Sequence, residues 1–248
     1  SGVGTQTRHL IDGLIQKGTW SFRQLGAAMK HTSYDVITIN DDFIIKPVDG
    51  FGTRDQIRLI LATEKPDGIL IFTDPRFFVW FFEIEDEVRQ VCPIFYWHVW
   101  DNKPYPNFNN PYYDSCDLIN CHSYHNYQQV LEHYPEKTNV VPHALPSNVY
   151  YEIPDDEKLK FRKQFFGEDG KDLFIGFWMN RNAKRNRPGD LLIAWSLFLK
   201  ELQKQHGHKK AKLLMHTDPK DPEGPDLTKI VDMLDIKDYV LFSNQRVG

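Results

Sequence analysis

The sequence has few cysteines, no long apolar run and no excess of charge of one sign. Its 248 residues include three cysteines, Cys92, Cys116 and Cys121. So small and odd a number argues against a disulfide scaffold and predicts a reducing compartment, which we take to be the cytoplasm. No segment approaches the ~18 consecutive apolar residues of a transmembrane helix. We therefore expect a soluble globular protein without a transmembrane segment.

The charges nearly balance, with 30 Lys and Arg against 34 Asp and Glu and a formal net charge of -4. No block of like charge occurs, so the sequence predicts no general surface for nucleic acid, and any anion site must be local. Hydrophobic residues make up 41% of the chain and aromatic residues 14%, which is enough to build buried cores. The length allows one large domain or two modest ones. The oligomeric state is not predicted.

Apolar strands alternate with helices along the first part of the chain. A helix is expected over residues 5–17, and two β-rich runs at 34–39 and 43–48 form a hairpin or bent extension around Asp41 and Asp42. Alternating strands and helices indicate βαβ units and a parallel sheet. The expected helices then cover 54–64, 77–90 and 124–133, and the strands cover 68–73, 93–98, 117–121 and 139–142.

A second alternation begins after a Pro-rich stretch and a charged helix over 157–166. It has three expected strands (173–179, 212–217 and 239–243) and two helices (190–205 and 227–234). An open doubly wound domain usually has about five or six strands, so this domain looks incomplete. The sequence thus predicts an α/β protein of two Rossmann-like parallel-sheet domains, with a first domain at 1–145, a connecting segment at 146–170 and a partial second domain at 171–248.

A glycine pair opens the chain, in Gly2-Val3-Gly4 before the first helix. Glycines let a backbone approach a ligand closely, and a helix start favours phosphate, although a tight turn explains the pair equally well. The dinucleotide pattern G-x-G-x-x-G fails because its third glycine falls on Thr7. This disfavours a nicotinamide-dependent Rossmann enzyme.

A histidine and a run of aromatic residues follow the strand at 93–98. His98 lies at the carboxyl end of this strand, the edge where open α/β sheets bind ligands, and it could contact a sugar or carry a proton. The alternative is a packed histidine in a core. The loop that follows offers Trp100 and Tyr105 as surfaces for carbohydrate, although packing explains most of its aromatic residues.

A basic loop separates the strand at 173–179 from the next helix. Four cations, Arg181, Lys184, Arg185 and Arg187, stand at a helix start, where they oppose the helix dipole unless an anion is bound. We expect a phosphate here, and a solvated surface loop is the alternative. By contrast, Cys116, Cys121, His122 and His125 match no standard zinc spacing, so we expect no metal.

These motifs, in this order, resemble the retaining GT-B glycosyltransferases of the large family 4, over nearly the whole chain. The resemblance rests on Gly2-Val3-Gly4, on His98 with Asp101 nearby, on the exit Val140-Val141-Pro142-His143-Ala144, and on Arg181 followed by Arg187 and Asp190-Leu191-Leu192. Arg181 and Arg187 lie one position further apart than the corresponding cations of the family, and Arg187 stands where the family has Lys. Lys184, Arg185 and Arg187 therefore all stay open as the second phosphate contact. Thr73-Asp74-Pro75-Arg76 is weakly similar to glycosyltransferases of phages and their hosts.

The resemblance implies a nucleotide diphosphate-sugar donor, an acceptor of unknown kind, and no metal or other cofactor. Its diphosphate would bind the cations of the basic loop and the amides of Gly2 to Gly4, and His98 would be the catalytic residue beside the reacting sugar. The nucleoside candidates are Thr217, Asp218, Asn244 and Arg246. The acceptor-side candidates are Asp74, Arg76, Trp100, Asp101 and Tyr105.

One expected feature of that family is missing from the sequence. Its pair of glutamates, eight positions apart, would lie beyond Gly248, and the strand expected before Gly2 is also absent. We therefore expect a fragment cut at both ends, with weak or no transferase activity by itself. A non-catalytic module that binds a sugar or nucleotide is the alternative function.

Overall fold

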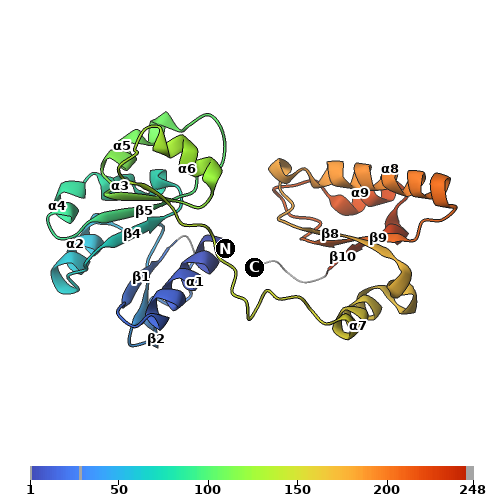
Figure 1. Ribbon diagram of the computed structural model, residues 1–248, viewed down its shortest axis with the longest axis horizontal. Coiled ribbons are helices and arrows are strands. Elements are labelled where there is room, and N and C mark those ends of the chain that lie inside the picture. The colour runs from blue at the N-terminus through green and yellow to red at the C-terminus, as the bar shows by residue number, and fades with distance from the viewer. Residues whose placement is uncertain (1, 28–29, 244–248) are drawn as a thin grey trace. The chain divides into compact units, whose positions relative to one another are not determined.

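The computed structural model describes residues 2–27 and 30–243 and divides into two compact units (Figure 1). The N-terminal unit is Ser1–Tyr150 and the C-terminal unit is Tyr151–Gly248. Each has its own hydrophobic core and its own parallel sheet. The α/β class expected from the sequence is confirmed. No helix in the described residues is long and apolar enough to cross a membrane.

A four-stranded parallel sheet forms the centre of the N-terminal unit, in the order β4-β5-β6-β7. Because all four strands are parallel, their carboxyl ends meet at one edge, where the candidate residues of this unit lie. One row of residues in register, Phe72, Trp97, Asn120 and Asn139, crosses the sheet. The strands are β4 (Ile69–Phe72), β5 (Ile94–His98), β6 (Leu118–Cys121) and β7 (Thr138–Val140).

Short helices cover the core of this sheet. The core contains Tyr96, Tyr113 and Ile119, each at most 1% exposed. The longest of these helices, α2, begins with a capping box between Thr53 and Gln56, which satisfies its first amides. The helices are α2 (Arg54–Thr63), α3 (Val79–Phe82), α4 (Glu85–Arg89), α5 (Asn110–Asp114) and α6 (Tyr124–Leu131), and the 3-10 turns are η1 (Pro75–Phe78) and η2 (Asn107–Asn109).

The single helix expected over 77–90 is wrong, since η1, α3 and α4 occupy this segment. Phe78 and Ile84 leave helical geometry, with φ/ψ of -117/25° and -119/23°. The interruptions turn Phe81, Phe82 and Ile84 all into the core, where none is more than 9% exposed. An uninterrupted helix would spread these side chains around more of its circumference.

A second sheet of this unit has the order β1-β3-β2. β2 (Ile37–Asn40) and β3 (Phe43–Pro47) form an antiparallel hairpin, which is one of the two arrangements expected for these runs. β1 (Phe22–Gly26), which pairs parallel with β3, was not expected, because its mixed sequence has no strand pattern and the pairing itself defines it. Helix α1 (Gly2–Gln16) begins three residues earlier than expected, at Gly2.

The C-terminal unit has three parallel strands in the order β10-β9-β8. Leu213 and Met215 of β9 pack against Leu192 and Leu199 of the long helix that follows β8. This unit therefore places the basic loop between a strand and a helix, as expected. Its elements are α7 (Asp155–Phe166), η3 (Glu168–Asp172), β8 (Phe174–Met179), η4 (Lys184–Asn186), α8 (Pro188–His206), β9 (Ala211–His216), α9 (Leu227–Met233), η5 (Lys237–Tyr239) and β10 (Val240–Phe242).

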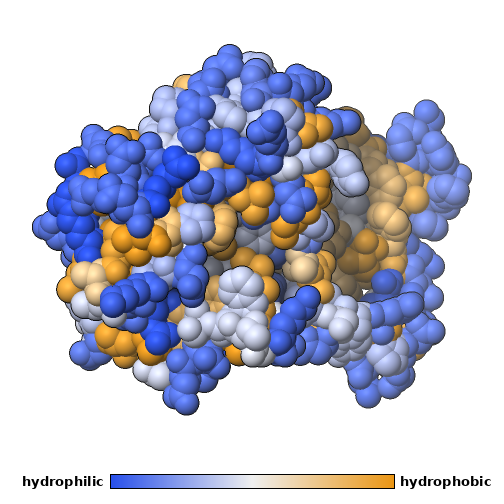
Figure 2. Space-filling model, turned by 60° about the vertical axis from the view of Figure 1, so that its left-hand side comes forward, coloured by the Kyte–Doolittle hydropathy of each residue, from blue (hydrophilic) through white to orange (hydrophobic). Residues whose placement is uncertain are grey.

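Figure 2 shows apolar residues in patches scattered between hydrophilic ones on the face turned toward the viewer. Exposed apolar side chains of the N-terminal unit include Leu59, Phe77 and Val79. Phe77 is stacked on Phe51, with ring centroids 4.3 Å apart. Scattered residues of this kind are ordinary on a protein surface.

Candidate functional site

Arg181 is held by a carboxylate at the carboxyl edge of the C-terminal sheet. Its Nε and Nη2 atoms donate to the two oxygens of Asp221, at 2.7 and 3.1 Å. The hydrogen bond from Arg181 lowers the pKa of Asp221, and Asp221 in turn raises the pKa of Arg181. The Arg181 side chain is nevertheless 60% exposed. It is thus oriented by the segment after β9.

The other cations of the basic loop differ in their partners. Arg187 forms an ion pair with Asp190 in the first turn of α8, and its own backbone is left-handed, with φ of 50°. Lys184 and Arg185 are exposed and form no ion pair with any described residue. Acidic side chains therefore offset two of the four charges near the helix start without a bound anion. The opposition between these cations and the helix dipole is therefore weaker evidence for a bound anion. Lys184 and Arg185 are the two cations of the loop that are available to bind one.

A buried asparagine and a glycine join this loop to the segment after β9. Asn182 is fully buried, and its Nδ2 donates to the carbonyl oxygens of Pro219 and Pro225, at 3.2 and 2.8 Å. A Cβ atom on Gly224 would lie 2.2 Å from Asn182 Oδ1, so only glycine fits there. This contact was not expected from the sequence, although the glycine between Pro222 and Pro225 signals a close approach of backbones.

The nucleoside candidates fall partly outside the described residues. Thr217 follows β9 and is 1% exposed, with an Oγ1 that has no partner among the described residues. Asp218 is exposed, and its Oδ1 accepts from the amide of Lys220 at 2.9 Å. Asn244 and Arg246 lie outside the described residues. A hydrogen bond not expected from the sequence joins His216 Nδ1 and Ser243 Oγ, at 2.6 Å.

His98 lies at the carboxyl edge of the N-terminal sheet, as expected. It is 1% exposed, and neither ring nitrogen has a partner among the described residues. Burial, reinforced by His122, lowers the pKa of His98 to about 4. The imidazole is therefore neutral near pH 7, with one donor and one acceptor nitrogen, and both nitrogens are buried.

Two further histidines come to the same edge from the next two strands. His122 Nδ1 lies 2.8 Å from the carbonyl oxygen of His98, and because a carbonyl only accepts, this nitrogen carries the proton. His143 stacks on His122, with centroids 4.8 Å apart, and burial lowers the pKa of His143. From the sequence, His122 was considered only as a metal ligand and His143 had no predicted role. Their positions after adjacent parallel strands were the available signal.

The acceptor-side candidates are largely engaged with their own neighbours. Asp74 accepts from Arg76 Nε at 2.9 Å, and the Arg76 guanidinium lies 5.3 Å from the ring centre of Phe108. Tyr105 stacks on His133 at 3.9 Å, so it serves packing. Trp100 Nε1 donates to the carbonyl oxygen of Pro104 at 3.1 Å, and Asp101 is exposed.

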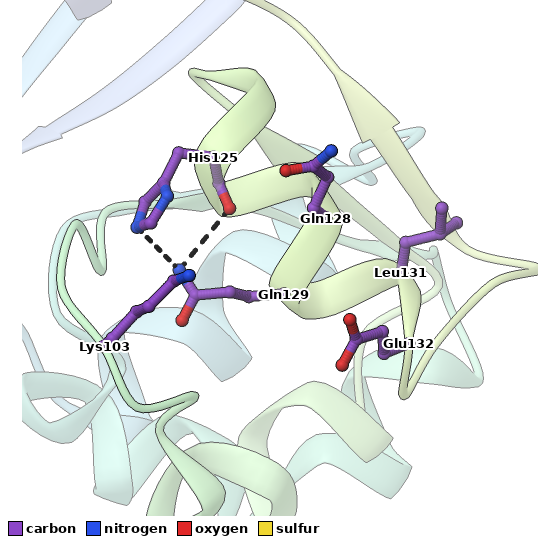
Figure 3. A pocket seen from close by; sticks show the side chains of 6 residues that line it. All are labelled: Lys103, His125, Gln128, Gln129, Leu131 and Glu132. Atoms are coloured by element: carbon purple, nitrogen blue, oxygen red, sulfur yellow. Dashed lines mark hydrogen bonds between the residues drawn. The ribbon is translucent and has the colours of Figure 1, made fainter.

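A pocket of about 410 Å³ lies between the loop after β5 and the outer face of α6 (Figure 3). Gln129 donates to the ring nitrogen Nε2 of His125 at 3.1 Å, and its own buried Oε1 has no partner among the described residues. Figure 3 shows Lys103 reaching toward these two side chains. This pocket was not expected from the sequence. Its remaining lining residues are Gln128, Leu131 and Glu132.

The glycines at the start of the chain form part of α1, not a loop before it. Gly2, Val3 and Gly4 make up the first turn of this helix. A first turn tolerates glycine because its amides need no partner within the helix. Two residues on, Gln6 exchanges hydrogen bonds with the backbone of Ala144, at 3.1 and 3.2 Å, which ties α1 to the segment after β7.

No group of three or more His, Cys, Asp or Glu residues placed to hold a metal ion occurs in the part of the chain that the structure describes. Cys116 and Cys121 are buried, and burial raises the pKa of each thiol to about 12. Both are therefore protonated near neutral pH and poor metal ligands.

No family model matches the sequence, and no curated protein matches it. Solved structures do match. A trehalose-6-phosphate synthase, OtsA, matches with a TM-score of 0.62 at 11% identity, and the match covers 95% of this chain and 68% of the OtsA chain. A UDP-forming trehalose-phosphate synthase from Burkholderia xenovorans has a TM-score of 0.59 at 13% identity and covers 99% of this chain and 72% of its own.

A glycosyltransferase from Rickettsia africae also matches, with a TM-score of 0.56 at 14% identity. It covers 80% of this chain and 54% of its own. The trehalose-phosphate synthases among these neighbours are GT-B glycosyltransferases. The chain has a GT-B-type fold. Identities this low establish the fold alone, and the roles of individual residues depend on the geometry described above.

Proposed function

We propose that this chain belongs to a retaining glycosyltransferase, of the family 4 type, that uses a nucleotide diphosphate-sugar donor and no metal. The observation that carries this proposal is the basic loop after β8. Lys184 and Arg185 are exposed there with no ion-pair partner among the described residues, while Asp221 and Asp190 already engage Arg181 and Arg187. The loop thus keeps two cations available for an anion at a helix start.

In this proposal each residue has a distinct task. Lys184 and Arg185 bind the diphosphate and stabilise the negative charge that develops on it as the sugar leaves. Arg181, oriented by Asp221, shapes the loop and adds positive charge. Of the two described candidates for the nucleoside side, Asp218 already accepts a hydrogen bond from the Lys220 amide, and Thr217 has a hydroxyl with no partner among the described residues.

The N-terminal unit supplies the groups proposed to contact sugars. His98 is neutral and its two ring nitrogens are buried and unpaired, so a sugar hydroxyl that reaches them would meet one donor and one acceptor and no charge. Asp74, Arg76, Trp100 and Asp101 remain candidates for the acceptor. Thr73, beside Asp74, has a φ of 122°, a strained value for a β-branched residue of the kind that clusters at functional sites.

The experiment is a binding screen of the chain with UDP, GDP and ADP by calorimetry, followed by an assay of nucleoside diphosphate release from the corresponding sugar donors. One solved neighbour is described as bound with UDP-2-fluoro glucose and another as in complex with glucose-6-phosphate, so UDP-glucose and glucose 6-phosphate are the first pair to try. Release that depends on an acceptor supports a transferase. Binding without release supports the non-catalytic module, and no binding of any of the three nucleotides contradicts the proposal.

A further inference from the structure

A second pocket of the N-terminal unit, with a volume of about 240 Å³, lies between helix α1 and the main sheet. Its walls are mainly apolar: Leu10 and Leu14 come from α1, Trp97 from β5, and Val141 and Pro142 from the segment after β7. Trp97 is buried, whereas Leu10 and Leu14 are only half-buried. A ligand in this pocket would therefore cover apolar surface that water now reaches.

The pocket is long because it follows one stripe of α1. Gln6, Leu10, Gly13, Leu14 and Lys17 all line it, and these positions recur at the three- and four-residue spacing of one helix face. Between positions 6 and 16 the helix axis advances about 15 Å, at ~1.5 Å per residue. A linear ligand that lies along α1 can therefore contact the whole stripe.

Gly13 leaves open space in the middle of this stripe. The residue is exposed, and a Cβ atom built on it has no neighbour within 4 Å. Glycine is less favourable than alanine inside a helix, so this position lowers the helix propensity of α1. In return it leaves the pocket wider than any larger side chain would.

The charge around the pocket has one sign. Lys17 lines the pocket directly after the end of α1, is exposed, and forms no ion pair with any described residue. Asp12, the acidic residue of α1, does not line the pocket and is paired with Arg8 at 2.6 Å. Among the described residues no acidic side chain lines the pocket, whose other polar residues are Gln6 and His9. An anionic group at this end would thus meet a cation and no repelling side chain.

We propose that this pocket binds a linear acyl chain as its free carboxylate, with the hydrocarbon along Leu10, Leu14 and Trp97 and the carboxylate beside Lys17. The apolar walls account for the hydrocarbon, the length of the stripe accounts for the linear shape, and Lys17 accounts for the charge. An esterified chain would leave Lys17 without an anion. This inference is independent of the proposed donor site, whose phosphate-binding residues lie in the C-terminal unit.

The ligand class is tested by calorimetry of the full chain with hexanoate, octanoate and decanoate. Each buried methylene group should strengthen binding about fourfold, so each step of this series should strengthen it roughly fifteenfold. Decanoate should also bind more tightly than decanol, and decylamine should bind most weakly, because Lys17 attracts an anion and repels a cation. Equal binding of the three decyl compounds would contradict the role of Lys17. No binding of decanoate would overturn the inference and assign the pocket to water only.

The location is tested with two variants of Gly13. Gly13→Leu narrows the pocket, Gly13→Ala is its matched control, and both replacements favour the helix, so both chains should fold with a Tm at or above that of the unmodified chain. We expect Gly13→Leu to weaken decanoate binding at least about tenfold, since each methylene displaced from the pocket costs about fourfold. Gly13→Ala should stay within about threefold of the unmodified chain. Unchanged affinity in Gly13→Leu would place the ligand elsewhere and overturn the inference.

The charge is tested by reversing it at Lys17. Lys17→Glu should weaken decanoate binding about tenfold, because a charge-assisted contact is lost, and should strengthen decylamine binding. Lys200→Glu makes the same change at an exposed position on α8 and should leave both affinities unchanged. Equal effects of the two variants would show a general effect of net charge and would contradict the proposed contact.

Discussion

The carboxylate of Asp221 accepts two hydrogen bonds from the guanidinium of Arg181, across 40 positions of sequence. This contact joins the loop after β8 to the segment after β9. It gives the most basic stretch of the chain one orientation before any ligand binds. Two of the loop's four cations, Arg181 and Arg187, have acidic partners. The other two, Lys184 and Arg185, have none among the described residues.

Removing the carboxylate of Asp221 should lower thermal stability in a pH-dependent way. The partner Arg181 lowers the pKa of Asp221 below 3.8, so the folded state favours the ionised form. The resulting stabilisation is present above the unfolded pKa and disappears as pH falls through the lower folded pKa. Asp221→Asn should therefore lower Tm near pH 7 and match the unmodified chain at the acid end. An equal Tm near pH 7 would contradict a structural role for the pair.

His98 should make the fold less stable in mild acid. Its pKa is about 4 when folded and near 6.5 when unfolded, so the unfolded chain binds the proton more readily. Stability should fall as pH decreases from about 6.5 to 4, by about 3 kcal/mol from this residue. Urea unfolding at both ends of this range measures the change.

The matched variants for that measurement are His98→Gln and His206→Gln. The first removes the buried imidazole and should reduce the pH-dependent loss, whatever its effect at pH 7. The second removes an exposed histidine on α8 and should leave the loss unchanged. The same pH-dependent loss in both variants would show that His98 is not the group responsible.

A methyl group at Gly224 should disrupt the contact between the two loops of the C-terminal unit. The new Cβ would lie 2.2 Å from Asn182 Oδ1 and 2.3 Å from its carbonyl oxygen. Gly224→Ala should therefore cost about 1–3 kcal/mol in unfolding free energy. Gly189→Ala is the control, because its Cβ would meet Ile230 at an ordinary 3.4 Å. Equal stability of the two variants would contradict the close packing.

The sequence predicted the fold where patterns are local. Apolar strands alternating with helices were sufficient to predict both parallel sheets. The two β-rich runs around Asp41 and Asp42 predicted a hairpin or a bent extension, and the structure has the hairpin. β1 could not be predicted, because a short mixed segment becomes a strand only by pairing with β3. The break at Ile84 depends on which aromatic side chains reach the core, and this is decided by tertiary packing.

The same distinction applies to the candidate site. His98, Arg181 and Thr217 stand at or just after predicted strand ends, which predicts that they lie at the carboxyl edges of the sheets. The structure places them there. The partners of Arg181 and Asn182 could not be predicted, because Asp221 and Gly224 come from a distant loop whose path depends on the whole unit. The sequence left Lys184, Arg185 and Arg187 as alternatives, and the ion pair of Arg187 with Asp190 now favours the first two as the available cations.

Binding of a nucleoside diphosphate to the basic loop is the central claim, and calorimetry of UDP, GDP and ADP binding to a double variant tests it most directly. Lys184→Ala with Arg185→Ala removes the two available cations, and Lys200→Ala with Lys229→Ala removes the same charge from exposed positions on α8 and α9. We predict at least about a tenfold loss of affinity in the first double variant, since charge-assisted hydrogen bonds are lost. The second should bind almost as well as the unmodified chain. Equal affinity in the two double variants would contradict the account.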